Sequence, residues 1–75
     1  MEIKKTAVSE VAARNIKLEL VDQDIRKNAL AIKAGIPSTT FDRKLNNPGQ
    51  FTLKELGSIA EALDLRFEDL FKGTA

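Results

Sequence analysis

Four polar side chains of different chemistry recur at helical spacing in the middle of the chain. In the order i, i+3, i+4, i+7 they are Thr39, Asp42, Arg43 and Asn46. On a helix this spacing places them on one face, which then offers a hydroxyl, a carboxylate, a guanidinium and an amide. These groups read base edges in DNA: arginine pairs with guanine, asparagine with adenine, a carboxylate accepts from cytosine, and threonine contacts polar edges or the thymine methyl group. The pattern predicts a helix suited to the major groove.

The same segment has an apolar back and a glycine turn before it. Phe41 and Leu45 lie four residues apart, so they share a stripe that faces inward. Gly35 suits a turn with positive φ, and Pro37 suits the start of the next helix. We expect helices over about residues 26–34 and 38–46, the first with Leu30, Ala31 and Ala34 inward. Two helices joined by a short glycine turn form a helix-turn-helix over about residues 26–46.

Helical spacing also recurs on both sides of this unit. A first helix is expected over about residues 7–22, because Val8, Val11, Ala12, Ile16 and Leu20 follow the i, i+3, i+4 spacing of a helix. Asp24 is expected to cap the second helix. Residues 46–50 read as a loop, after which Thr52 and Glu55 form a capping box.

The chain continues with a fourth helix to about residue 64, indicated by the helical spacing of Leu53, Leu56, Ile59, Ala60 and Leu63. Of these, Leu56, Ile59 and Leu63 are expected in the core, together with Phe41 and Leu45. A short fifth segment then places Phe67, Leu70 and Phe71 on one side. No strand pattern is visible. The predicted fold is all-α: a compact five-helix domain with a central helix-turn-helix.

Composition narrows the function classes. The 75 residues suit one domain over 1–75, and 43% apolar with 31% charged residues fits a globular chain. His, Cys, Trp and Tyr are all absent, which removes the usual general base, the thiolate nucleophile and the common zinc ligands. We therefore expect no enzyme, metal, cofactor or small-molecule ligand. With no apolar run for a membrane and no signal segment, we expect the cytoplasm or nucleoid of a bacterial host cell.

Charge is unevenly distributed along the chain. The net charge is +1, yet residues 26–47 carry +4 while residues 1–25 carry −1 and residues 48–75 carry −2. A basic central segment suits a polyanion. The alternative is a solvated helix face with no partner.

The stretch LAIKAGIPSTTFDRKL, residues 30–45, resembles the helix-turn-helix of the lambda-repressor and Cro family of DNA-binding domains. The matching positions are Leu30, Ala31, Gly35, Ile36 and Phe41. The likeness continues through FTLKELGSIAEALDLRFEDLF and covers about residues 15–71. Within the family, the sequence resembles small regulators of phages or actinobacteria. The chain departs from the family at Arg26, where a capping Ser or Thr is frequent, and at Asp64, where Gly is common.

The resemblance implies roles for individual residues. It places base contacts at Ser38, Thr39, Asp42 and Arg43. We expect Arg43 on guanine to be the main contact. For Asp42 the alternative is that it reads no base and instead weakens non-specific binding or pairs with a neighbouring residue. The resemblance places contacts with the DNA backbone at Lys27, Lys44, Asn46 and Asn47. Lys44 stands where many members have an apolar residue, so its stem would pack while its head reaches a phosphate.

As a function, the resemblance implies a small transcriptional regulator, a phage Cro-like or immunity repressor that occludes a promoter. Two alternatives stay open: a protein-binding module such as an antitoxin or repressor antagonist, and an architectural DNA binder. Ile32 would mark a protein contact in the first. Residues 1–6, with Lys4 and Lys5, would form either a flexible arm on the duplex or a frayed terminus that makes no DNA contact. Phe67, Leu70 and Phe71 would complete the core or form a homodimer patch.

Overall fold

Helical segments make up most of residues 7–72, the part of the chain that the computed structural model describes. They are α1 (Ala7–Asp22), α2 (Lys27–Ala34), α3 (Ser38–Asn46), η1 (Pro48–Gln50), α4 (Leu53–Ala62) and η2 (Phe67–Phe71). The described residues contain no strand, so the all-α prediction is confirmed. The fifth predicted helix is a 3-10 helix, and a 3-10 turn also occupies the predicted loop. The predicted arm at residues 1–6 lies outside the described residues.

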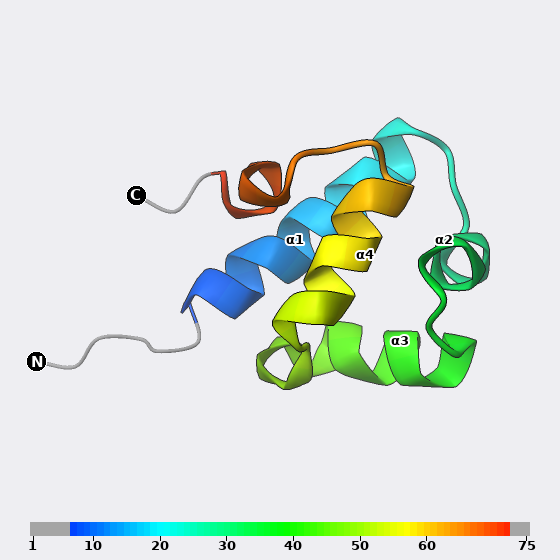
Figure 1. The fold of residues 1–75 in the computed structure, drawn as a ribbon, viewed down its shortest axis with the longest axis horizontal. Coiled ribbons are helices and arrows are strands. Elements are labelled where there is room, and N and C mark those ends of the chain that lie inside the picture. The colour runs from blue at the N-terminus through cyan, green and yellow to red at the C-terminus, as the bar shows by residue number, and fades with distance from the viewer. Residues whose placement is uncertain (1–6, 73–75) are drawn as a thin grey trace, which may run out of the picture.

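The elements surround a small core and leave α3 at one edge of the molecule (Figure 1). α2 packs against both α3 and α4, while α1 packs against η1 and η2. No helix among residues 7–72 combines the length and the apolar content that a membrane span requires. The α3 helix therefore packs mainly against α2 and η1.

Apolar side chains from every α-helix and from η2 form one core. Its buried members are Ala12, Ala13, Ile16, Leu20, Leu30, Ala31, Ile36, Phe41, Leu45, Leu56, Ile59, Ala60, Ala62, Leu63 and Leu70. The predicted inward positions Leu30, Ala31, Phe41 and Leu45 are confirmed. The predicted core positions Leu56, Ile59 and Leu63 are confirmed too. Val8 and Leu53, in the first turns of their helices, are 53% and 74% exposed.

Three helices end with the same left-handed turn. After α2, Gly35 has φ 75°, its N–H donates to Ile32 O at 3.0 Å, and the Ile36 N–H donates to Ala31 O at 2.9 Å. This is a Schellman motif, and buried Ile36 anchors it to the core. The same two bonds follow α1 and α4, where the left-handed residue is Asp24 (φ 54°) or Asp64 (φ 64°).

This ending explains why the predicted cap of α2 is wrong. Asp24 terminates α1 and does not start α2. Arg26 occupies the N-cap position instead, with extended backbone and no side-chain hydrogen bond. The capping box of α4 is confirmed: the Glu55 N–H donates to Thr52 Oγ1 at 3.0 Å, and the Thr52 N–H donates to Glu55 Oε1 at 2.9 Å.

The η2 segment is fastened to α1. The Asn15 amide donates to Leu70 O at 2.7 Å and to Lys72 O at 2.8 Å. These bonds satisfy the carbonyl of Leu70, within η2, and that of Lys72, which follows it. Leu70 is fully buried, and a surface patch that includes it is therefore excluded.

The left-handed turns predict stability changes of opposite sign. A Cβ at Gly35 would meet no atom within 4 Å, so Gly35→Ala adds only backbone strain and should lower the free energy of unfolding by about 1 kcal/mol. Asp64→Gly removes such strain, and it also removes a negative charge from the end of α4. It should raise the free energy by about 0.5–1 kcal/mol, as measured by urea unfolding.

Asp64→Asn is the matched control, because it removes the charge and keeps the strained backbone. We expect it to give part of the gain of Asp64→Gly. A Gly35→Ala variant as stable as the parent would contradict the account of these turns.

Candidate nucleic-acid interface

The α3 helix has a buried back and an exposed front. Phe41 is fully buried and meets Phe51 edge to face, with ring centroids 6.3 Å apart. This contact fixes the rotation of α3 about its own axis. The predicted stripe consequently faces outward, since Thr39, Asp42, Arg43 and Asn46 are all exposed. Ser38, in the first turn of α3, is exposed as well.

Asp42 is joined to the start of α2 by an ion pair. The Lys27 Nζ lies 2.7 Å from Asp42 Oδ1, and the two side chains are 56% and 54% exposed. The pair brings together one predicted base contact and one predicted backbone contact. Sequence reasoning did not foresee it, because the two residues are fifteen positions apart and only the angle between α2 and α3 brings them together.

Lys44 makes a second ion pair of a different kind. Its ammonium donates to both carboxylate oxygens of Glu55 at 2.8 Å, and the side chains are only 15% and 22% exposed. Glu55 Oε1 also accepts from the Thr52 N–H. The Lys44 ammonium and the Thr52 N–H together hold the pKa of the Glu55 carboxyl below its ordinary value of 4.5. Lys44 therefore ties α3 to the start of α4, and a phosphate contact would require its ammonium to leave or share Glu55.

Arg43 differs from both of its neighbours. It is exposed, and its guanidinium makes no ion pair or side-chain hydrogen bond within residues 7–72. Arg26 and Lys33 likewise have no carboxylate partner in that part of the chain. Of the cations in the basic segment, these three remain available to an external anion. Arg43 alone among them lies on α3.

The two asparagines at the end of α3 cap the helix. Asn46 Nδ2 donates to Asp42 O at 3.2 Å, and Asn47 Nδ2 donates to Arg43 O at 3.3 Å. Each amide carries two N–H groups, so one is used and a second is left for another acceptor. Both side chains are exposed.

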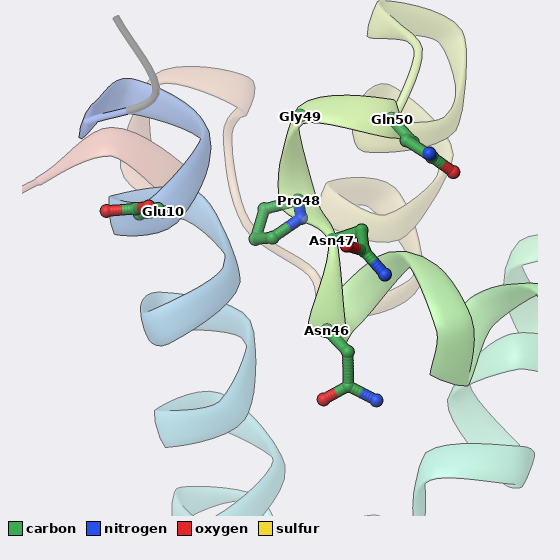
Figure 2. Close-up of a pocket in the computed structure, with 6 residues that line it drawn as sticks. All are labelled: Glu10, Asn46, Asn47, Pro48, Gly49 and Gln50. Atoms are coloured by element: carbon green, nitrogen blue, oxygen red, sulfur yellow. The ribbon is translucent and has the colours of Figure 1, made fainter. Parts of the chain in front are cut away.

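An open pocket of about 330 Å³ lies beside these asparagines, between η1 and the start of α1. Figure 2 shows Glu10 on α1 across from Pro48, with Asn46, Asn47 and Gln50 on the other side. The lining is one carboxylate with amides and a proline, which does not favour an anion inside the pocket. Within residues 7–72 no cluster of His, Cys, Asp and Glu side chains is arranged to hold a metal ion.

Comparison with known proteins gives one match. The sequence model for the Cro/C1-type HTH DNA-binding domain covers residues 15–74, which include α2, α3 and α4. Searches of curated proteins and of solved structures returned no match. The matched region contains every residue of the predicted interface.

The Lys44–Glu55 pair predicts a pH-dependent stability. Because the folded state lowers the pKa of Glu55, ionised Glu55 contributes stability in full above pH 4.5. That contribution declines as the pH falls below 4.5 and is absent once the folded-state pKa has been passed. Glu55→Gln should thus lower the free energy of unfolding at pH 7 by about 1 kcal/mol. Urea unfolding should show the gap between variant and parent closing in strong acid.

Glu68→Gln is the control, since Glu68 is 74% exposed and its nearest cationic atom lies 3.7 Å away. It should change stability little at either pH. A loss from Glu55→Gln that is the same at pH 7 and in strong acid would rule out the charge as its cause.

Proposed function

The chain belongs to the Cro/C1-type helix-turn-helix DNA-binding family, and we propose that it is a sequence-specific regulator that binds double-stranded DNA with α3 in the major groove. The observation that supports this proposal most strongly is the ion pairing of three consecutive charged residues on α3, Asp42, Arg43 and Lys44. Asp42 and Lys44 are neutralised by partners, whereas the Arg43 guanidinium is exposed and has no ion-pair partner within residues 7–72. A cation without a partner on the outward face of this helix is suited to an acceptor on the DNA.

Arg43 is proposed as the main base contact. Its guanidinium would donate two parallel hydrogen bonds to guanine O6 and N7, worth about 1–3 kcal/mol of discrimination against other bases. Ser38, Thr39 and Asp42 would read neighbouring base edges from the same exposed face. The buried contact of Phe41 with Phe51 supports this role, because it fixes which residues of α3 point outward.

Phosphate contacts are proposed on both sides of α3. Lys27 lies in the first turn of α2, and Asn46 and Asn47 each keep one amide N–H for a phosphate oxygen. Lys44 would have to share its ammonium with Glu55, so we expect it to contribute least among the four. Such contacts make the affinity depend on salt and position the protein without reading sequence.

Regulation would follow from occupancy of the DNA alone. We propose that residues 1–75 act as one DNA-binding domain in a phage Cro-like or immunity repressor, which blocks a promoter by covering it. A homodimer would use the aromatic pair of η2, in which the Phe67 and Phe71 rings meet edge to face at 5.2 Å and Phe67 is 42% exposed. Its two half-sites would lie about one helical turn, roughly 34–36 Å, apart or a multiple of this.

A protein-binding role is the second candidate, and one observation favours it. Ile32 is 75% exposed on α2, although an isoleucine gains from burial. An antitoxin or repressor antagonist would use this side chain against a protein partner and would show no salt-dependent affinity for DNA. An architectural DNA binder would show the salt dependence without base preference.

Selection of duplexes from a random pool distinguishes these functions. A defined motif whose affinity falls steeply with salt would support the sequence-specific regulator, and the symmetry of the motif would separate monomer from dimer. Salt-dependent binding with no motif would support the architectural role. The absence of binding at low salt would refute the DNA-binding proposal and direct the search to Ile32.

Arg43 predicts a loss of base preference at one position. Arg43→Lys keeps the charge and removes the planar fork, so it should lower affinity for the selected duplex by about ten- to hundred-fold, with a much smaller change on random duplex. Lys27→Ala should weaken binding to the selected duplex and make its salt slope shallower by about one phosphate, without changing the motif that is selected. Fluorescence anisotropy titrations at several salt concentrations measure both effects. Equal losses on the two duplexes for Arg43→Lys would contradict the assignment.

A further inference from the structure

The Lys27–Asp42 ion pair joins two residues that the proposed function assigns to different parts of the DNA. Lys27 is assigned to a phosphate and Asp42 to a base edge, yet the free protein holds Lys27 Nζ 2.7 Å from Asp42 Oδ1. Lys27 cannot give its full charge to a phosphate while it stays with Asp42. DNA binding and this ion pair therefore compete for one ammonium group.

The pair is weak enough for DNA to open it. Both side chains are more than half exposed, and exposed ion pairs contribute only about 0.2–1 kcal/mol. A phosphate offers Lys27 an equivalent partner. Opening the pair, however, leaves the Asp42 carboxylate uncompensated beside a polyanion.

Within residues 7–72, no cation other than Lys27 forms an ion pair with Asp42. The Lys44 ammonium is held by Glu55, and the Asn46 amide donates to the backbone oxygen of Asp42, not to its carboxylate. Arg43 is adjacent in sequence, and consecutive residues of a helix do not face each other. A donor on the DNA can compensate Asp42 once Lys27 leaves, and the amino group of cytosine is the donor that a carboxylate recognises in the major groove.

We propose that Asp42 determines specificity by withholding Lys27 from phosphate on any sequence that does not offer Asp42 an amino group. On a matching site the cytosine N4 replaces Lys27 as the partner of Asp42, and Lys27 is released to the backbone. On other sequences the pair persists or Asp42 is repelled, so non-specific binding is weakened. This inference rests on the DNA binding proposed above and adds a coupling between backbone contact and base readout.

Asp42→Asn tests the coupling, since asparagine keeps the size of the side chain and removes its charge. On random-sequence duplex we expect the variant to bind about two- to five-fold tighter, because Lys27 no longer has a competing partner. The slope of log affinity against log salt should steepen by about 0.9, the amount for one further phosphate. Duplex selection with the variant should lose the preference for cytosine at one position and keep the guanine read by Arg43.

Two controls separate this mechanism from a general effect of charge. Asp22→Asn makes the same change in net charge at the end of α1, which lies away from α3 (Figure 1), and should move the slope by much less. In a Lys27→Gln background, Asp42→Asn should have no more effect on the slope than Asp22→Asn.

The outcomes are distinct. Wild-type protein that binds no duplex refutes the proposed function, and this inference falls with it. If the wild-type protein selects a motif, two results would overturn the coupling alone and leave DNA binding in place. One is a salt slope for Asp42→Asn equal to that for Asp22→Asn. The other is an effect of Asp42→Asn on the slope that stays the same in the Lys27→Gln background.

Discussion

Burial of Phe41 is the constraint on which the arrangement of this protein depends. The ring is fully buried and leans on Phe51, so α3 can present only one face to solvent. Leu45, one turn later, is buried on the same side and prevents the helix from pivoting about a single contact. The polar stripe is thus exposed as a consequence of packing behind it. The geometry of the interface is set by apolar residues that never reach the surface.

A second determinant is the turn that gives α2 and α3 their relative angle. Gly35 adopts a left-handed conformation without strain, and Ile36 is carried directly into the core. This angle brings the first turn of α2 close to the middle of α3, where Lys27 meets Asp42. The chain uses aspartate for the equivalent turns after α1 and α4, where a less favourable conformation costs only stability. At Gly35 the strain of a non-glycine residue would act on the turn that sets the angle between α2 and α3.

The sequence predicts the features that depend on neighbouring residues and misses those that depend on the tertiary fold. The capping box at Thr52 and Glu55 and the turn at Gly35 involve groups within a few residues, so local chemistry determines them. Asp24 was misassigned because an aspartate between two helices is compatible with either the end of one or the start of the next. The two ion pairs of α3 join residues fifteen and eleven positions apart, and no local pattern reports such pairs.

The three consecutive charged residues of α3 have different roles because they occupy different positions around the helix. Successive residues are separated by about 100°, so each of them meets a different environment. Lys44 is turned toward α4 and is largely covered, where an ion pair with two hydrogen bonds fixes the helix. Asp42 is turned toward α2 and is half exposed, where an ion pair is weak and exchangeable. Arg43 lies between these directions with no described partner. A largely buried ion pair holds the helix in place, an exposed ion pair can be replaced by contacts with DNA, and a guanidinium with no described partner can recognise a base. Burial thus separates the roles of three consecutive charged residues that composition alone does not distinguish.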